Sequence, residues 1–362
     1  MAQASKSKTK VKKSASSKAP SAKKASAKNA KGAKNLVVVE SPAKARTIEN
    51  ILGDDYRVIA SVGHVRDLPA YGYGLEDFET FKPKYVVIKN KKNGIDKTEI
   101  INEIAEAAAV AENVYLSTDP DREGEAISWH IVEASNIPLE KTSRVVFHEI
   151  TAPAIAEAFA NPGELDMNLV DAQQTRRVLD RLIGFPLTWF VQGKITRSAS
   201  AGRVQSVALR IVIDREREIQ AFVPEEYWTI EALLAKQGKH LEAGLVKLPG
   251  EKGKPTISDG TTATRLVDTF NRSAFTVSSV KKGTRKSAPR APFTTSTYQQ
   301  AANNSLGLGA QRAMSLAQQL YEGIDLPGEG PVGLITYMRT DSVNVSEVAQ
   351  GEARTFVTGR WT

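Results

Sequence analysis

The chain has 362 residues, a formal net charge of +8, 41% hydrophobic residues, no cysteine and four histidines. A chain of this length can build two or three domains with their own cores. The missing thiols exclude disulfides, thiolate zinc sites and a cysteine nucleophile, so any metal must be held mainly by oxygen atoms.

Most of the excess positive charge belongs to residues 1–34. This segment contains eleven lysines and no acidic residue, whereas the rest of the chain has 38 basic and 41 acidic residues. Because it is rich in Lys, Ala and Ser, it cannot bury enough apolar surface to offset the entropy of ordering. We expect a disordered tail whose partner is a polyanion. The sequence has no apolar stretch typical of a signal peptide or a membrane span, which predicts a cytosolic protein without membrane contact.

The segment after the tail predicts alternating strands and helices. Strands are expected at 36–39, 56–62 and 114–116, and helices at 41–52, 97–111 and 123–134. The first strand is an apolar, β-branched run typical of a parallel sheet buried on both faces. Ser41 and Pro42 then supply an N-cap and a first-turn proline. This alternation predicts a doubly wound α/β domain, which binds ligands at the carboxyl ends of its strands.

The second half of the chain predicts a helical lobe, a β-rich segment and a further mixed region. Helices are expected at 171–183, 203–220 and 297–321, strands at 227–234, 241–248 and 275–280, a basic connection at 281–292 and an apolar run at 333–335. We find no internal repeat and no Gly-x-x-x-x-Gly-Lys-Ser/Thr loop, so nucleotide hydrolysis is not indicated.

Acidic residues follow two of the predicted strands. Glu40 comes after the first strand, and Asp119, Asp121 and Glu123 come after the strand at 114–116. Carboxylates from two neighbouring strand ends suit a hard cation such as Mg²⁺. The alternative for 119–123 alone is helix-start electrostatics, because acidic side chains are favoured near a helix N-terminus without any metal.

Lys44 lies in the first turn of the helix at 41–52, where its charge opposes the helix dipole. A bound phosphate would remove that conflict. A lysine extended into solvent is the alternative.

Tyr337 lies in the sequence Thr-Tyr-Met-Arg-Thr-Asp-Ser and is a candidate nucleophile at a phosphate. Arg339, two residues further in an extended segment, would face the same way and could hold a phosphate oxygen. Asp341 is a candidate to orient that arginine. The free phenol titrates near pH 10, so nearby positive charge is needed to favour the phenolate. A half-buried packing tyrosine is the alternative.

Further basic residues could follow a phosphate backbone. Arg176, Arg177 and Arg181 share the helix at 171–183, and pairing of Arg181 with Asp180 or Asp214 is the alternative. Gly202, Arg203, Val204 and Gln205 begin the next helix and offer an anion-binding end. His64 follows a strand and could donate to a phosphate or base, although a structural histidine is the default.

Five segments taken together resemble bacterial type IA DNA topoisomerases. They are Glu-Ser-Pro-Ala-Lys at 40–44, Ser-Val-Gly-His-Val-Arg-Asp-Leu-Pro at 61–69, Asp-Pro-Asp-Arg-Glu-Gly-Glu-Ala-Ile at 119–127, Ser-Ala-Gly-Arg-Val-Gln-Ser at 200–206 and Thr-Tyr-Met-Arg-Thr-Asp-Ser at 336–342. Their order and spacing agree with the family from about residue 35 to about residue 345. The lysine-rich tail and the lack of cysteine resemble the actinobacterial branch.

The resemblance implies an α/β plus mixed fold in five parts: a tail at 1–34, a TOPRIM domain at 35–165, a helical DNA-binding lobe at 166–222, a β-rich arch segment at 223–290 and the start of the nucleophile domain at 291–362. It implies that Glu40, Asp119, Asp121 and Glu123 surround Mg²⁺, with Glu40, Lys44, Tyr337 and Arg339 as catalytic residues. The DNA-contacting residues implied are His64, Arg176, Arg177, Arg181, Ala201, Gly202, Arg203, Val204, Gln205, Ser206, Arg339 and Asp341.

The function implied is ATP-independent relaxation of negatively supercoiled DNA. Tyr337 would cut one strand, form a 5′-phosphotyrosyl link, and allow strand passage and resealing. We expect a monomer associated with the nucleoid, binding DNA and no nucleotide. The family's chains continue for several hundred residues further, so this chain is expected to be a fragment that keeps the cleavage site.

Three alternatives remain open at the level of sequence. The fragment could bind and cleave a single strand without relaxing DNA. Another TOPRIM enzyme, primase-like or a nuclease, would need Asp119 and Asp121 but not Tyr337. A non-catalytic DNA-binding module would depend on residues 1–34.

Overall fold

A computed structural model describes residues 34–90, 95–250 and 252–361, so the predicted tail lies, apart from residue 34, outside the described residues. The chain divides into two units, one formed by Met1–Phe185 with Ala291–Thr362 and one by Pro186–Arg290. The division between residues 185 and 186 falls inside the long helix Met167–Lys194.

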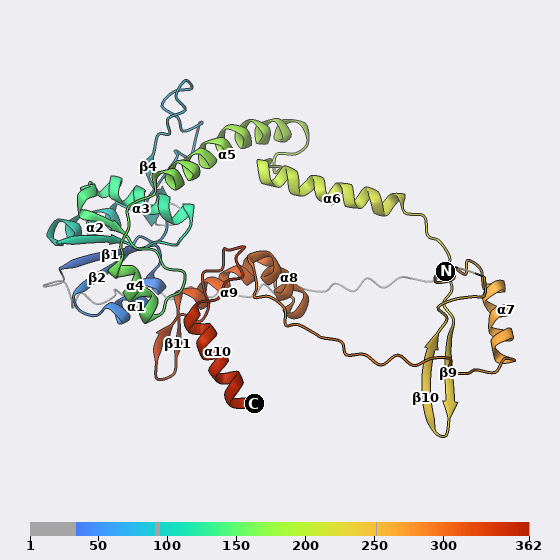
Figure 1. The fold of residues 1–362 in the computed structure, drawn as a ribbon. Helices are drawn as coiled ribbons and strands as arrows, with labels where there is room; N and C mark the ends of the chain where they lie inside the picture. Colours follow the sequence, from blue (N-terminus) through green and yellow to red (C-terminus); the bar gives the residue numbers. More distant parts are fainter. Residues whose placement is uncertain (1–33, 91–94, 251, 362) are drawn as a thin grey trace, which may run out of the picture. The chain divides into compact units, whose positions relative to one another are not determined.

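The first unit is built on a four-stranded parallel sheet (Figure 1). Its strands lie in the order β2 (Tyr56–Ala60), β1 (Asn35–Val39), β7 (Asn113–Leu116) and β8 (Thr142–Arg144). Val38 of β1 pairs with Ile59 of β2 on one side and with Leu116 of β7 on the other. The central strand therefore belongs to the continuous apolar run at 36–39, as the sequence predicted.

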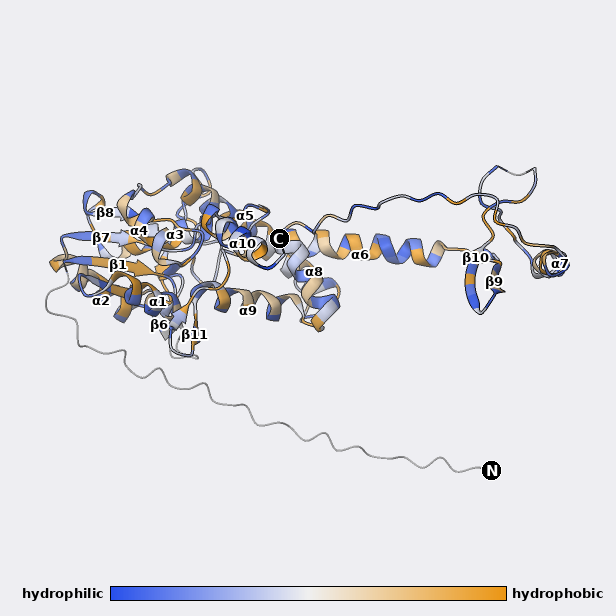
Figure 2. Ribbon diagram, turned by 60° about the horizontal axis from the view of Figure 1, so that its bottom comes forward, coloured by the Kyte–Doolittle hydropathy of each residue, from blue (hydrophilic) through white to orange (hydrophobic). Residues whose placement is uncertain are grey.

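Helices cover both faces of this sheet, which confirms the doubly wound α/β domain. Leu36 and Val38 pack into one core cluster, together with residues of α2 (Thr98–Val110) and α3 (Arg122–Ser135). Val37 and Val39 point to the other face and pack with α1 (Pro42–Leu52), α4 (Ala152–Ala160) and α9 (Ala310–Glu322). Strand β1 is hydrophobic along its length (Figure 2) because both its faces are buried.

The segment from Ala291 onward packs on this domain and belongs to the same unit. Tyr321 at the end of α9 is fully buried in the second core cluster, and the Thr47 hydroxyl of α1 donates to the Glu322 carbonyl at 2.7 Å. Gly323 follows with φ of +117°, and a Cβ there would lie 2.4 Å from Thr47 Oγ1. This close approach brings the C-terminal part of the chain to the edge of the sheet.

The remaining elements of the first unit are short or peripheral. They are β3 (Arg66–Asp67), β4 (Val86–Val87), β5 (Lys89–Asn90), β6 (Ile95–Asp96), the 3₁₀ turn Leu139–Lys141, α8 (Thr295–Leu306), β11 (Ile324–Leu326), β12 (Gly330–Val332) and α10 (Glu347–Arg360). Helix α5 (Met167–Lys194) begins in the first unit and continues into the second.

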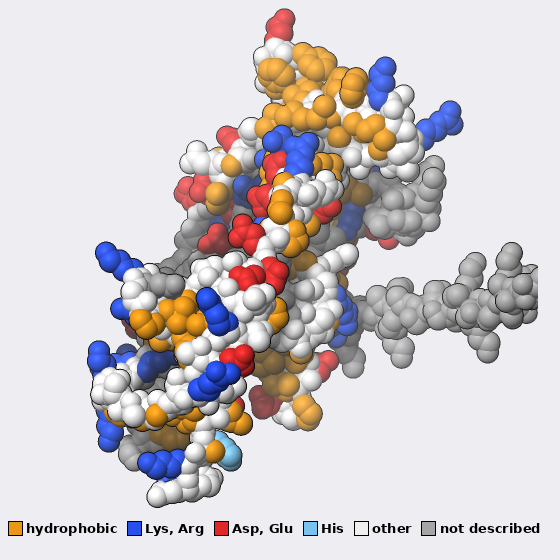
Figure 3. Space-filling model, turned by 90° about the vertical axis from the view of Figure 1, so that its right-hand side faces the viewer, with side chains coloured by type: hydrophobic (Ala, Val, Ile, Leu, Met, Phe, Trp, Pro, Cys, Tyr) orange, Lys and Arg blue, Asp and Glu red, His pale blue; other side chains and the backbone are white. Residues whose placement is uncertain are grey.

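The second unit is formed by Pro186–Arg290. It contains the end of α5, then α6 (Arg203–Ala221), the hairpin β9 (Glu231–Lys236) and β10 (Lys239–Gly244), and α7 (Gly260–Asn271). The hairpin turns at Gln237 and Gly238, both with positive φ, as two-residue hairpin loops require. No residue of α6 is buried, and several of its Val, Leu and Ile side chains are exposed. Figure 3 shows hydrophobic side chains among the charged and polar ones on one face of the molecular surface.

The structure corrects several predicted elements. The helix expected at 297–321 is two helices, because the chain breaks at Gly307–Gly309, where Gly307 has φ of +65°. The strand expected at 275–280 is wrong: these residues are exposed and pair with no strand among the described residues. Helix α5 is longer than 171–183 despite Pro186. Strand β8 and helix α4 were not predicted.

Across the described ranges, no helix is both long and apolar enough to span a bilayer.

Candidate active site

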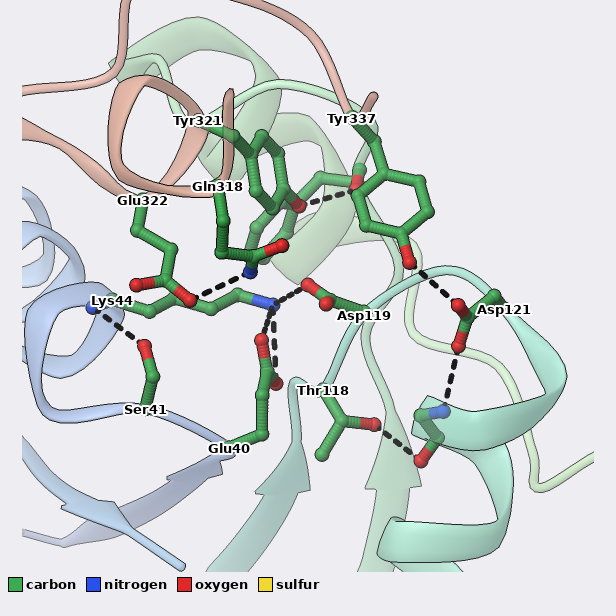
Figure 4. Close-up of polar contacts among 12 residues, drawn as sticks. Glu40, Ser41, Lys44, Thr118, Asp119, Asp121, Gln318, Tyr321, Glu322 and Tyr337 are labelled. Atoms are coloured by element: carbon green, nitrogen blue, oxygen red, sulfur yellow. Dashed lines mark hydrogen bonds and ion pairs between the residues drawn. The ribbon is translucent and has the colours of Figure 1, made fainter. Parts of the chain in front are cut away.

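The acidic residues of the sequence motif gather at one edge of the parallel sheet. Glu40 directly follows β1, and Asp119 follows its neighbour β7, so both carboxylates lie at adjacent strand ends (Figure 4). This is the position that the sequence predicted for them.

A buried lysine joins these two carboxylates. The ammonium group of Lys44 lies 3.1 Å from Glu40 Oε1 and 3.1 Å from Asp119 Oδ1, and its side chain has no solvent exposure. The rings of Phe147 and Tyr321 lie within 6 Å of the same nitrogen. The solvent-exposed alternative for Lys44 is therefore wrong. Two carboxylates and two aromatic rings offset the cost of burying the charge.

The two carboxylates differ in their protonation. Burial raises the pKa of Glu40 to about 7. Burial also disfavours ionised Asp119, but the Lys44 ammonium and a hydrogen bond from Glu40 together hold the pKa of Asp119 below its ordinary value. Glu40 therefore gains or loses its proton close to neutral pH, beside an ionised Asp119.

The turn from Thr118 to Gly124 holds Asp121 in place. Asp121 is the N-cap of α3 and its Oδ1 accepts from the Gly124 amide at 2.8 Å. The Thr118 hydroxyl donates to the Gly124 carbonyl at 2.6 Å. A Cβ at residue 124 would lie 2.1 Å from the Asp119 carbonyl oxygen, so only glycine fits. Asp121 therefore does stabilise the start of a helix, which was the alternative to metal binding. This capping contact uses Oδ1 and leaves Oδ2 for another partner.

The buried side chain of Arg144 stabilises the same turn through hydrogen bonds to its backbone. Arg144 donates to the carbonyl oxygens of residues 116, 118 and 119 at 2.9–3.0 Å and to Glu125 Oε2 at 2.8 Å. Sequence reasoning missed both Arg144 and Glu125. Their only sequence signal was charge within otherwise apolar segments, which did not indicate a pairing across 19 residues.

Tyr337 reaches this edge from the far end of the chain. Its hydroxyl donates to Asp121 Oδ2 at 2.5 Å, across 216 residues of sequence. Its backbone amide donates to the His148 carbonyl at 2.7 Å, and its ring lies edge-on to Tyr321 at 5.3 Å. The side chain is buried in the second core cluster, with 4% of its surface exposed, and its hydroxyl points to the Asp121 carboxylate (Figure 4).

The surroundings of Tyr337 favour the protonated phenol. Burial and the hydrogen bond to Asp121 raise the pKa of Tyr337 above its ordinary value, and Arg339 opposes this only in part. The sequence analysis expected nearby positive charge to favour the phenolate. In this state the pKa of Tyr337 is raised instead. The phenol therefore keeps its proton in this state, and Asp121 is the group that accepts its hydrogen bond.

Arg339 extends toward the same carboxylate, with Nη1 3.5 Å from Asp121 Oδ2. More than half of its side chain is exposed, so the guanidinium remains accessible to a phosphate. Asp341, predicted to orient Arg339, is exposed two residues further on, and Arg339 is oriented by Asp121 instead.

Glu123 contacts side chains from two other parts of the first unit. Its carboxylate accepts from Gln173 Nε2 at 3.0 Å and lies 3.5 Å from His64 Nε2. The hydrogen bond with His64, followed by that from Gln173, lowers the pKa of Glu123 to about 2. His64 is therefore held at the cleft by an acidic residue rather than packed as a structural core histidine.

The four carboxylates do not form a ready-made metal centre. Among the described residues, no three His, Asp or Glu side chains converge closely enough to hold an ion. The donor set nevertheless fits Mg²⁺, because carboxylate oxygens from Asp119, Asp121 and Glu123 line one cleft of about 750 Å³ together with Arg339. Glu40 lines the same cleft.

Residues on α9 pack beside this site, and one of them, Gln318, lines the cleft; the sequence analysis did not single them out. Gln318 donates to Glu322 at 2.7 Å, and Tyr321 separates these residues from Tyr337 (Figure 4). Their spacing of i, i+3 and i+4 places them on one helix face, which was a usable signal.

A smaller pocket of about 180 Å³ adjoins the cleft at His64 and Glu123. There, Arg66 Nε donates to His130 Nδ1 at 3.2 Å, and its guanidinium lies over the rings of Tyr85 and Trp129. Burial, together with Arg66, lowers the pKa of His130 to about 3. Sequence reasoning missed this cluster because its members come from separate elements.

The predicted arginine stripe lines the same side of the first unit. Arg177 pairs with Asp67, and Arg181 donates to the carbonyls of residues 69 and 72 at 2.7 and 3.2 Å. Arg176 lies 3.9 Å from Asp180 and lines the small pocket with Arg177. The contacts of Arg181 are thus with backbone carbonyl oxygens, whereas the alternative considered for it was pairing with Asp180 or Asp214.

Residues 201–206 lie at the start of α6 in the second unit. Gly202 is the N-cap of that helix, and Ala201 exchanges two backbone hydrogen bonds with the Thr188 hydroxyl at 3.0 and 3.1 Å. A DNA-binding role for Ala201, Gly202, Arg203, Val204, Gln205 and Ser206 stays a prediction.

Two protein-family profiles match the chain. One described as DNA topoisomerase matches residues 164–361, and one described as Toprim domain matches residues 35–150. The chain therefore belongs to the bacterial type IA DNA topoisomerase family.

The chain is also similar to a solved structure, full-length topoisomerase I from Thermotoga maritima. The two share 40% sequence identity with a TM-score of 0.75, and the match covers 90% of this chain and 52% of the other. The chain thus spans about half the length of that relative.

Proposed function

We propose that this chain cleaves and reseals a single DNA strand through Tyr337. The observation that carries the proposal is the 2.5 Å hydrogen bond from the Tyr337 hydroxyl to Asp121, which lines the same cleft as Glu40 and Asp119. A packing tyrosine also needs a partner for its hydroxyl, but the partner of Tyr337 is one of the clustered carboxylates at the ends of β1 and β7.

In the proposed cleavage step, the Tyr337 oxygen attacks a backbone phosphorus as Asp121 receives the phenolic proton. The bond between phosphorus and the 3′ oxygen breaks, and the phosphate stays on the 5′ side as a phosphotyrosyl ester. Glu40, whose pKa is raised to about 7, is the proposed donor of a proton to the leaving oxygen. Resealing reverses each transfer, so no ATP is needed.

The cationic groups stabilise the phosphate during this exchange. Arg339 is accessible beside Asp121 and can pair with a non-bridging oxygen, as guanidinium groups do with phosphates. Lys44 is buried and fixed between Glu40 and Asp119, two carboxylates that line the cleft. When Mg²⁺ is bound, Asp119, Asp121 and Glu123 would hold it, and it would neutralise charge on the phosphate oxygens.

The DNA strand is proposed to continue along the basic side of the first unit. His64 and Arg176 line the small pocket beside the cleft, where Arg66 Nη2 and Gln173 Oε1 are buried without hydrogen-bond partners in the described parts of the chain. One free donor and one free acceptor suit a polar ligand such as a nucleotide. Relaxation of negatively supercoiled DNA is the activity proposed for the whole family-length protein.

The test is adduct formation with a single-stranded oligonucleotide labelled at its 3′ end, incubated with Mg²⁺. A labelled covalent adduct is expected with the wild type and not with Tyr337→Phe. Tyr71→Phe, which removes a hydroxyl from an almost fully exposed ring, is the matched control and should form the adduct. An adduct that persists in Tyr337→Phe would overturn the assignment and favour another Toprim enzyme.

A further inference from the structure

The turn that carries His64 is held in a strained conformation. Val62 has φ of +58° and Gly63 has φ of +81°, so two consecutive residues adopt left-handed backbone. Glycine adopts this region freely, whereas a β-branched residue does so at a cost because its side chain crowds the backbone. Val62 is 57% exposed, so burial does not offset that cost. Another part of the fold must hold the turn.

Lys97 makes the contacts that hold it. Its ammonium group donates to the carbonyl oxygens of Ser61 at 3.0 Å and Val62 at 2.6 Å. Two carbonyl oxygens that repel each other thereby share one cation. Lys97 is itself fixed, because it is the N-cap residue of α2 and its backbone amide donates to the Ile88 carbonyl at 3.0 Å.

The same turn connects the two sides of the acidic cleft. The Gly63 amide donates to the Glu40 carbonyl at 2.8 Å, and the Ser61 hydroxyl donates to the Gly63 carbonyl at 2.9 Å. The next residue, His64, lies 3.5 Å from Glu123 at the start of α3. The backbone at 61–64 therefore sets the distance between the end of β1 and the imidazole beside Glu123.

We infer that Lys97 is a positioning residue of the active site, which clamps the strained turn at Val62 and so holds His64 and the Glu40 backbone in register. Lys97 lines neither the cleft nor the small pocket. It acts through the turn. The inference rests on the proposed function, since the arrangement that it maintains is the one proposed to cleave DNA.

The test removes the clamp and then removes the strain. Lys97→Met keeps the length of the side chain but cannot donate, so the turn should relax. Single-turnover cleavage of a saturating oligonucleotide should slow by about 5–30-fold, the range that corresponds to the cost of one left-handed residue. The dissociation constant for the oligonucleotide should change far less than the rate. Adding Val62→Gly to Lys97→Met should restore most of the rate, because glycine adopts the turn without a clamp.

Lys82→Met is the matched control for loss of a positive charge. Lys82 is exposed and pairs with Glu76 at 2.9 Å, outside the turn, and its loss should leave the cleavage rate at the wild-type level. Equal slowing in Lys82→Met and Lys97→Met, or no recovery in the Lys97→Met, Val62→Gly double variant, would overturn the inference.

Hydrogen exchange separates this inference from the proposed function. The Gly63 amide should exchange faster in Lys97→Met than in the wild type, and more slowly again in the double variant. This measurement needs no cleavage. If the wild type forms no Tyr337-dependent adduct, the proposed function fails, and unchanged Gly63 exchange in Lys97→Met would show separately that the clamp does not exist.

Discussion

His130 shows how a single buried side chain responds to its surroundings. It is almost fully buried, accepts from Arg66 through Nδ1, and contacts the rings of His64, Tyr85 and Trp129. A second positive charge beside Arg66 would be poorly solvated there. The folded protein therefore keeps His130 neutral down to about pH 3, whereas the unfolded chain protonates it near pH 6.5.

This difference predicts an acid-dependent loss of stability. Between pH 6.5 and about 3 the unfolded state binds a proton that the folded state does not, so the free energy of unfolding falls as the pH falls. The slope is at most about 1.4 kcal/mol per pH unit for one group. His130→Gln keeps an acceptor for Arg66 without this protonation, so its midpoint of thermal unfolding should fall less steeply between about pH 6.5 and about pH 4.

His240→Gln is the control for this experiment, because His240 is exposed on β10. Its variant should follow the wild-type pH dependence. Parallel melting curves for the wild type and His130→Gln across the whole interval would contradict the neutral, buried state of His130.

At the scale of elements, the strand-to-helix connections position the chemistry. The turn between β7 and α3 combines a capping carboxylate, a buried hydroxyl and a glycine in close contact with backbone. Arg144 on β8 binds three carbonyl oxygens of the same connection. Together these interactions fix the direction in which Asp119 and Asp121 point.

Gly124→Ala tests this connection. The added Cβ would lie 2.1 Å from the Asp119 carbonyl oxygen, and backbone cannot move aside cheaply. We expect a loss of stability of about 1–3 kcal/mol, as for other overpacked sites, together with loss of adduct formation. Thermal unfolding and the oligonucleotide assay measure the two effects.

Gly351→Ala is the matched substitution. Gly351 lies within α10, and no described heavy atom outside its own helix turn lies within 4 Å of the position that a Cβ would take. Alanine should therefore stabilise the helix by up to about 1 kcal/mol without affecting the adduct. If Gly124→Ala were as stable and active as Gly351→Ala, the close packing of the turn would be refuted.

At the scale of the whole molecule, the lysine-rich segment and the cleft have separable roles. Residues 1–34 contain eleven lysines, while the proposed cleavage chemistry belongs to the first described unit. Deleting residues 1–34 should weaken oligonucleotide binding and reduce its salt dependence, because each lysine–phosphate contact adds about 0.7 to the slope of log affinity against log salt for a single strand.

The rate of adduct formation at saturating oligonucleotide should survive this deletion. Filter binding across a salt series and single-turnover cleavage would measure the two quantities separately. Complete loss of both binding and cleavage in the shortened chain would instead support a DNA-binding module that depends on its tail.

Local patterns were sufficient for the central part of the fold. The β-branched run at 36–39 specified a strand buried on both faces, and Ser41-Pro42 specified the start of α1, because these signals arise from neighbouring residues. Local patterns failed where the secondary structure depends on contacts with other segments or on a single glycine. The alternating residues at 275–280 have no adjacent strand to pair with in the described parts of the chain, and Gly307 interrupts a helical pattern that periodicity alone continued.

The sequence by itself determined which side chains could carry the chemistry: the carboxylates at two strand ends, the phenol of Tyr337 and the guanidinium beside it. Only the tertiary structure decided their states. Lys44 is buried between carboxylates, the phenol donates to Asp121, and Lys97 clamps a turn 35 residues away. These contacts join residues distant in the chain, and their energies depend on burial and distance, which no local pattern of residues encodes.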